Sequence, residues 1–209
     1  IVFDFWGTLF ENGVYSPLRQ THELLRVRER FGEFVEKFEK ALMTKETTLE
    51  EGLKAGCIAL DRDPKPFVIQ QLTTVWQQNQ DFAKPYPETM AVIQELHKKY
   101  TLGIISNTQT GAVEQLLKKF AMNSYFKAVV LSCSTGYLKT DKELFETALK
   151  KLKAKNSEAV MVGDSIETDI KGAEKAKIKA ILLDRRNTRE YPNKITTLTQ
   201  LPEMLEKIE

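Results

Sequence analysis

Polar residues that can carry chemistry stand directly after short apolar runs of this chain. The run "IVF" is followed by Asp4, with Gly7 and Thr8 a few residues on, and "LGII" is followed by Ser106 and Asn107. When apolar runs are strands of an open α/β sheet, the residues after them meet at the carboxyl edge, where ligands bind. The spacing therefore predicts that a carboxylate, hydroxyls and an amide converge at one place.

Two further motifs add a cation and two more carboxylates to this set. Lys139 stands in "GYLKTDKELF", and "GDSIETD" supplies Asp164 and, five residues later, Asp169. Three carboxylates at one edge repel one another unless a cation or protons intervene. Mg²⁺, a hard ion that prefers oxygen ligands, fits such a set. Lys139 and Ser106 can then hold an anion against the metal, and Asp4 can attack phosphorus through an aspartyl-phosphate.

The elements that must position these residues are indicated by the apolar pattern. Five short runs do not alternate with polar residues, so they predict strands buried on both faces: 1–3, 102–105, 128–131, 159–162 and 180–183. Segments with helical spacing of apolar residues precede the second, third and fourth of these runs: 87–99, 110–120 and 141–152. Strands that alternate with helices predict an α/β fold with a doubly wound, Rossmann-like parallel sheet.

A long segment between the first two runs has a different pattern. About ninety residues separate them without a comparable apolar run, and amphipathic helical patterns fill most of this stretch. We expect a helical domain at 14–82, inserted just after the first strand, and an α/β core made of 1–13 and 83–209.

Composition excludes several classes of protein. A net charge of +2 over 209 residues is too balanced for a nucleic-acid-binding surface, and no apolar run approaches the ~20 residues that a membrane span needs. Two cysteines form no disulfide framework, and the first residues lack the basic and apolar regions of a signal peptide. The expected protein is cytoplasmic, without a nucleic-acid or membrane partner, and its oligomeric state is not indicated.

Taken in order, "DFWGT", "SN", Lys139 and "GDSIETD" resemble the four motifs of the haloacid dehalogenase-like (HAD) hydrolase superfamily. The resemblance covers nearly the whole chain, and the helical insert stands where that family has its type 1 cap domain. It implies a magnesium-dependent phosphatase that acts on a small phosphorylated metabolite. By the same resemblance Asp4 is the nucleophile and a metal ligand, the backbone carbonyl of Trp6 is a second ligand, and Asp164 is a third.

The remaining motif residues receive roles by the same resemblance. Asp169 would support catalysis without binding the ion itself, while Lys139 serves both catalysis and phosphoryl binding. The other predicted substrate-binding residues are Thr8, Ser106 and Asn107.

One position departs from the family pattern. The residue two after the nucleophile is usually a second aspartate, which protonates the leaving group and later activates water, but here it is Trp6. An indole cannot transfer that proton, although the backbone ligand is retained. Since general acid–base catalysis contributes typically ~10²–10⁴-fold, we expect weakened catalysis toward poor leaving groups.

Several alternative functions follow from Trp6. A 2-haloacid dehalogenase also has an aromatic residue there and needs no metal, but it lacks the acidic pair that Asp164 and Asp169 provide. A phosphonate hydrolase lacks the second aspartate too, but it uses a cap lysine, and no lysine of the insert is singled out. A phosphomutase depends on the missing acid. A phosphate-binding or regulatory protein without turnover is the non-enzymatic alternative.

Overall fold

A six-stranded parallel sheet forms the centre of the molecule. The computed structural model describes residues 1–11 and 15–208. The strand order is β5-β4-β1-β6-β7-β8, and every neighbouring pair is parallel. The strands are β1 (Val2–Phe3), β4 (Gly103–Ser106), β5 (Ala128–Leu131), β6 (Val160–Gly163), β7 (Lys179–Leu183) and β8 (Lys194–Ile195). This sheet confirms the predicted doubly wound α/β fold.

The position of β1 in the sheet determines where a ligand can bind. The chain adds β4 and β5 on one side of β1, and it adds β6, β7 and β8 on the other side. The direction of strand addition therefore reverses at β1, and such a switch point opens a crevice at the carboxyl ends of the strands. All five predicted apolar runs are found as strands. The short strand β8 was not predicted, since Lys194–Ile195 contains no apolar run.

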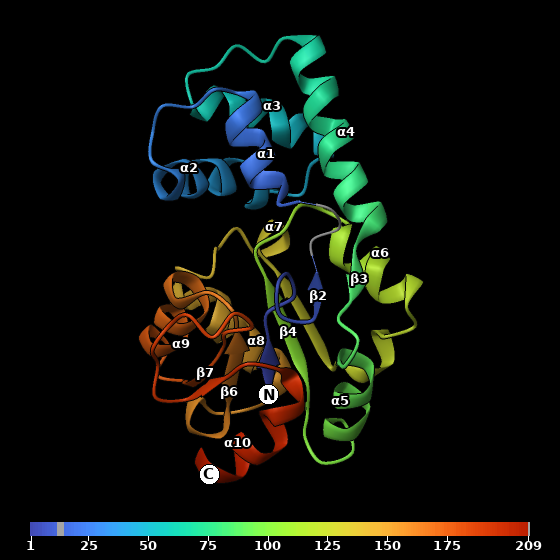
Figure 1. The fold of residues 1–209 in the computed structure, drawn as a ribbon, viewed down its shortest axis with the longest axis vertical. Coiled ribbons are helices and arrows are strands. Elements are labelled where there is room, and N and C mark those ends of the chain that lie inside the picture. Colours follow the sequence, from blue (N-terminus) through green and yellow to red (C-terminus); the bar gives the residue numbers. More distant parts are fainter. Residues whose placement is uncertain (12–14, 209) are drawn as a thin grey trace.

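Helices cover both faces of the sheet (Figure 1). The apolar cluster of one face includes residues of α5 (Thr89–Leu96), α6 (Ala112–Lys119) and α10 (Leu201–Ile208). The cluster of the other face includes residues of α8 (Lys142–Leu152) and α9 (Lys171–Lys175). Shorter elements connect these: α7 (Ser132–Thr135), the 3₁₀ turns at Asn123–Tyr125, Asn156–Glu158 and Leu198–Gln200, and a π-helical turn at Ile166–Ile170.

Four helices form a separate layer, here called the helical layer, beyond the carboxyl ends of the strands (Figure 1). They are α1 (Pro17–Leu24), α2 (Phe31–Met43), α3 (Leu49–Ala59) and α4 (Pro66–Phe82). The layer has its own apolar cluster, in which Phe34, Phe38 and Trp76 are buried. The same cluster includes Leu138, which lies between α7 and α8, so the helical layer also packs on the α/β core at this point.

A short antiparallel ribbon connects the helical layer to the sheet. It pairs β2 (Phe10–Glu11) with β3 (Lys84–Pro85), and no strand was predicted in either segment. The expected domain boundary at 13/14 lies outside the described residues, whereas the boundary at 82/83 coincides with the end of α4. The division into two domains stays a prediction. Of the helices within residues 1–11 and 15–208, none has both the length and the apolar character that crossing a membrane requires.

Candidate active site

Strand β1 delivers Asp4 to the carboxyl edge of the sheet. The Asp4 backbone N–H donates to the carbonyl oxygen of Val162 at 2.9 Å, so the pairing of β1 with β6 continues through this residue. The Asp4 side chain is buried, with 2% of the residue exposed. The backbone pairing of this central strand thus fixes the position of the Asp4 carboxylate at the carboxyl edge of the sheet.

The loop after Asp4 is held tightly against its neighbours. Gly7 has a φ of +83°, and a Cβ at this position would collide with the Asp164 carboxylate, so glycine allows the close approach. Arg185 holds the loop from the side of β7: its Nη2 donates to the Thr8 carbonyl oxygen at 2.9 Å, and its Nη1 lies 2.7 Å from Glu88 Oε1. These contacts bring the loop and Asp164 together.

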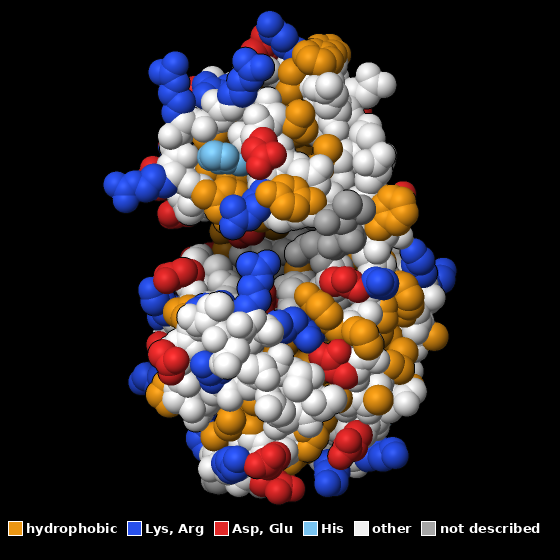
Figure 2. All heavy atoms as spheres, in the orientation of Figure 1, with side chains coloured by type: hydrophobic (Ala, Val, Ile, Leu, Met, Phe, Trp, Pro, Cys, Tyr) orange, Lys and Arg blue, Asp and Glu red, His pale blue; other side chains and the backbone are white. Residues whose placement is uncertain are grey.

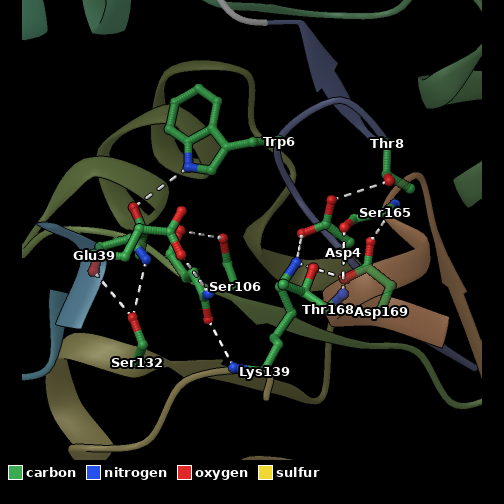
Figure 3. A network of polar contacts seen from close by, with 12 residues as sticks. Asp4, Trp6, Thr8, Glu39, Ser106, Ser132, Lys139, Ser165, Thr168 and Asp169 are labelled. Atoms are coloured by element: carbon green, nitrogen blue, oxygen red, sulfur yellow. Dashed lines mark hydrogen bonds and ion pairs between the residues drawn. The ribbon is translucent and has the colours of Figure 1, made fainter. Parts of the chain in front are cut away.

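Lys139 connects two of the predicted catalytic carboxylates (Figure 3). Its Nζ lies 2.6 Å from Asp4 Oδ1 and 2.6 Å from Asp169 Oδ1, and only 5% of the residue is exposed. Burial by itself would lower the pKa of Lys139, but Asp169 and Asp4 outweigh burial and hold this pKa above its ordinary value. Lys139 is therefore protonated and serves as the counter-charge at the centre of the site.

Three carboxylates surround this single ammonium. Oxygens of Asp4, Asp164 and Asp169 all lie within 4.8 Å of one another. Burial, together with the charges of Asp169 and Asp164, raises the pKa of Asp4 to about 8 against the opposing effect of Lys139. Burial and the Asp169 charge raise the pKa of Asp164 to about 6, against the effects of Lys139 and Arg189. The cluster thus carries more negative charge than Lys139 offsets.

The donor set of this cluster fits a hard cation. Both oxygens of Asp169 accept hydrogen bonds, from Lys139 Nζ and from the Ser165 backbone N–H at 2.9 Å. The Asp164 carboxylate, in contrast, accepts none from the side chain of another described residue, and it packs closely against Gly7. An all-oxygen set with excess negative charge and one unengaged carboxylate is the set that Mg²⁺ takes.

Thr8 and Ser106 lie beneath the site. Both are fully buried. The Thr8 hydroxyl donates to Asp4 Oδ2 at 3.1 Å, and the Ser106 hydroxyl lies 3.4 Å from the Asn107 carbonyl oxygen. Neither residue lines the cavity described below, whereas Asn107 does. Thr8 thus supports Asp4, and substrate contact by Thr8 and Ser106 stays a prediction.

Trp6 stands beside the carboxylates without an acid of its own. Its side chain is half-buried and lines the cavity, and its indole Nε1–H donates to the Thr108 hydroxyl at 3.4 Å. The ring therefore forms part of the wall, as Figure 3 shows, and its one polar group is engaged away from Asp4.

A cavity of about 240 Å³ lies between the sheet edge and the helical layer, at the level where Figure 2 shows the surface indented. The sheet side contributes Asp4, Trp6, Asn107, Gln109, Lys139, Asp164, Ser165 and Thr168. The helical layer and the residue before it contribute Ser16, Pro17, Leu18, Val35, Glu39, Met43, Trp76, Asn79 and Gln80. The predicted chemical groups therefore face a wall built from a distant part of the sequence.

Glu39 of α2 is a site residue that the sequence did not reveal. Its Oε2 accepts a hydrogen bond from Asn107 Nδ2 at 2.9 Å, while Asn107 Oδ1 accepts the Lys139 backbone N–H at 2.9 Å. Burial raises the pKa of the Glu39 carboxyl. Nothing in the helical pattern separates Glu39 from the exposed Glu36 of the same helix, so only the packing of the helical layer identifies it.

Comparisons with known proteins identify the family of this chain. A family model described as haloacid dehalogenase-like hydrolase matches residues 1–177. A glyceraldehyde 3-phosphate phosphatase of Methanothermobacter thermautotrophicus is 33% identical over 156 residues, which cover 68% of this chain and 69% of that protein. The chain spans about half the length of other curated phosphatases that it matches.

Two solved structures share the fold at low sequence identity. A HAD phosphatase from Thermococcus onnurineus superimposes with a TM-score of 0.67 at 22% identity, over 98% of this chain and 96% of that one. A 2-haloacid dehalogenase from Pseudomonas syringae superimposes with a TM-score of 0.68 at 21% identity, over 100% and 98%. The shared fold therefore does not by itself separate phosphatase from dehalogenase chemistry.

Proposed function

The chain belongs to the haloacid dehalogenase-like hydrolase family, and we propose that it is a magnesium-dependent phosphatase of small phosphorylated metabolites. The observation that carries the proposal is the contact of Lys139 with both Asp4 and Asp169, with oxygens of Asp164 within 4.8 Å of oxygens of both aspartates. A nucleophile for phosphoryl transfer needs cations around it to hold the phosphoryl oxygens. A dehalogenase site does not need the extra acidic pair.

In the proposed reaction, an Asp4 oxygen attacks phosphorus. A bond forms between this oxygen and phosphorus, the bond from phosphorus to the leaving oxygen breaks, and the leaving alcohol takes up a proton. Water then attacks the aspartyl-phosphate, which releases inorganic phosphate and restores the Asp4 carboxylate. The Lys139 ammonium and the Thr8 hydroxyl, 2.6 and 3.1 Å from the two Asp4 oxygens, support the side-chain orientation that the first step needs.

We propose that Asp4, Asp164 and the backbone carbonyl of Trp6 hold Mg²⁺. When bound, the ion would supply positive charge that reduces the repulsion between the Asp4 carboxylate and the phosphate and stabilises charge on the phosphoryl oxygens. Asp169 has both of its oxygens occupied by Lys139 and Ser165, which supports a role in holding Lys139 and not the ion. Lys139 and Asn107, together with Ser106, are the proposed phosphoryl-binding residues.

The helical layer is the proposed cap, inserted after β1 over residues 14–82. Helix α2 faces the sheet edge through Glu39, which bonds Asn107, and Thr47 donates its backbone N–H to Thr110 Oγ1 at 3.2 Å. Beside these polar contacts, Leu138 of the core packs in the apolar cluster of the helical layer. Such an arrangement supports a layer that selects the substrate and excludes water from the reaction.

A hydrolysis assay with and without metal tests the proposed function. We expect phosphate release from p-nitrophenyl phosphate and from small phosphomonoesters in Mg²⁺, and loss of this activity when a chelator removes the metal, since the acidic cluster lacks enough counter-charge. Halide release from 2-chloropropionate, unaffected by the chelator, would favour a dehalogenase. Absence of both activities, with phosphate binding retained, would favour the phosphate-binding alternative.

Trp6→Asp should narrow the difference between good and poor leaving groups. Nitrophenolate departs without help, whereas an alkoxide needs its proton delivered, so the wild type should favour aryl over alkyl phosphates. A carboxyl at position 6 should raise kcat/KM for alkyl phosphates selectively, by up to ~10²-fold. The measurement is kcat/KM for both ester classes in both proteins.

Trp6→Phe is the matched control, because it keeps a ring at the cavity wall but adds no acid. We expect its aryl-to-alkyl ratio to stay that of the wild type. Equal wild-type rates on both classes would mean that another group already supplies the proton. A folded Trp6→Asp variant inactive on both classes would mean that the indole shapes the site.

A further inference from the structure

Two residues of the helical layer that line the cavity, Glu39 and Asn79, have side-chain hydrogen-bond acceptors. They lie on different helices, α2 and α4, and neither belongs to the motifs at the sheet edge. The phosphoryl group is assigned to the opposite, sheet side of the cavity. These acceptors are therefore placed to contact the organic part of a substrate, to which the phosphate is bonded.

Asn79 has a buried acceptor that the protein does not use. Only 6% of the residue is exposed, and its Nδ2 donates to the Val75 carbonyl oxygen at 2.9 Å. Its Oδ1 is buried and finds no hydrogen-bond partner within the described part of the chain. Buried side-chain oxygens are nearly always paired, so this one indicates a donor that arrives with a ligand.

Glu39 has a carboxylate with too little compensation. Its hydrogen-bond partner among the described side chains is the neutral amide of Asn107, and no described lysine or arginine lies within ion-pair distance of it. The cation that faces it, Lys139, is engaged by Asp4 and Asp169, and Asp169 adds negative charge. Burial raises the pKa of Glu39, as expected for a carboxylate without a close counter-ion.

The aromatic donors of the cavity do not serve these acceptors. The indole N–H of Trp76 donates to Thr21 Oγ1 at 2.9 Å, and that of Trp6 donates to Thr108 Oγ1. The side chain of Gln80 likewise donates to Gln115 Oε1 at 2.7 Å. A ligand group that completes this wall must therefore donate hydrogen bonds and must carry positive charge to offset Glu39.

We propose that Glu39 and Asn79 form a subsite for a protonated amino group, so that the substrate is a small aminoalkyl phosphate. An ammonium offers three donors, which meet the need of the Asn79 oxygen, and a positive charge, which offsets the Glu39 carboxylate. A hydroxyl can donate a hydrogen bond to the Asn79 oxygen but leaves the charge of the Glu39 carboxylate uncompensated. The cavity of about 240 Å³ has room for a phosphate with a small carbon skeleton. The inference rests on the proposed phosphatase function for the other half of the substrate.

The test compares 2-aminoethyl phosphate with propyl phosphate, which has a methyl group in place of the ammonium. We expect the wild type to favour the amine in kcat/KM by about tenfold or more, as charge-assisted hydrogen bonds do. Glu39→Gln should lower this preference by about tenfold, and Asn79→Leu, which removes the acceptor at similar size, by a few-fold. Glu36→Gln, on the exposed side of α2, is the matched control and should keep the wild-type preference.

A binding measurement keeps the subsite testable apart from turnover. Calorimetric titration of Asp4→Asn protein with both esters, in Mg²⁺, should show tighter binding of 2-aminoethyl phosphate, and Glu39→Gln added to this protein should remove the difference. If no phosphomonoester is hydrolysed but this difference is found, the phosphatase function fails and the subsite stands. If p-nitrophenyl phosphate is hydrolysed but the two esters bind and react equally, the subsite fails and the phosphatase stands.

Two further outcomes would overturn the inference. Preference for 2-hydroxyethyl phosphate over the amine would assign the wall to a hydroxyl group. A Glu39→Gln variant that keeps its melting temperature but loses kcat equally on all esters, with a changed pH profile, would make Glu39 a proton carrier. Asn79→Leu separates these cases, because its effect should depend on the amine only if the subsite is correct.

Discussion

Asp4→Asn should lower phosphate release by at least about 10³-fold while the protein stays folded. The amide is nearly the same size but is a poor nucleophile, so no aspartyl-phosphate can form. The measurement is kcat on p-nitrophenyl phosphate in Mg²⁺, with circular dichroism to verify the fold. Asp63→Asn, an exposed aspartate of the helical layer, is the control and should retain activity. Near wild-type turnover by the Asp4 variant would exclude Asp4 as the nucleophile.

The same substitution should have a pH-dependent effect on stability. Burial, with Asp169 and Asp164, raises the pKa of Asp4 in the folded protein to about 8, and an unfolded aspartate titrates near ~3.9. Between these values the folded protein holds a proton that the unfolded chain has released, so the free energy of unfolding falls as pH rises. In buffer without Mg²⁺, Asp4→Asn should therefore raise the melting temperature, and more so at pH 8 than at pH 5.

A melting temperature that is unchanged by Asp4→Asn at both pH values would contradict this account of the site. Added Mg²⁺ should reduce the difference between the two proteins, because the ion offsets the charge of Asp4 in the wild type. The thermal shift thus reports on the acidic cluster independently of enzyme activity.

Lys139→Met should be nearly as damaging to activity and should also destabilise the fold. Methionine keeps the approximate length of the side chain but removes the ammonium that lies 2.6 Å from both Asp4 and Asp169. Loss of one charged group that stabilises transferred oxygens costs about 10²–10³-fold in kcat. Breaking a buried ion pair on one side costs about 3 kcal/mol of unfolding free energy, or roughly 6–12 °C in melting temperature.

The destabilisation by Lys139→Met should depend on pH. Below its pKa of about 8, Asp4 is protonated and no longer carries the buried negative charge that the variant cannot offset, so the loss of stability should be smaller at pH 6 than at pH 9. Lys142→Met removes a lysine three residues away whose ion pair with Glu146 is exposed, and it should change stability by less than about 1 kcal/mol. Equal effects of the two substitutions would show that Lys139 is not the central counter-charge.

The α/β core could be predicted from the sequence alone. The run "AVVL" is the strand Ala128–Leu131, and the other four runs are found within one or two residues of the predicted ends. Short strands that are buried on both faces must be continuously apolar, so their pattern is visible without knowledge of their neighbours. The segments that follow strands of a parallel sheet all start at its carboxyl edge. For this reason the convergence of Asp4, Lys139, Asp164 and Asp169 was predictable.

Features that depend on contacts between distant segments could not be predicted from the sequence and are seen only in the folded structure. The ribbon of Phe10–Glu11 with Lys84–Pro85 and the strand Lys194–Ile195 are too short to leave a periodic signal, because pairing with neighbours and not apolar patterning forms them. The burial of Thr8 beneath Asp4, and its absence from the cavity lining, likewise follow from the tight loop at Gly7.

The wall of the cavity that the helical layer contributes is the clearest feature that no sequence pattern predicts. Glu39 and Asn79 read as two more polar positions on amphipathic helices, like their exposed neighbours. Their place in the cavity wall depends on how the helical layer packs over the sheet edge. This packing brings Glu39 into contact with Asn107, 68 residues away in the sequence. Local patterns encode which residues follow a strand, whereas the partners of a helical face are set by packing between segments far apart in the chain.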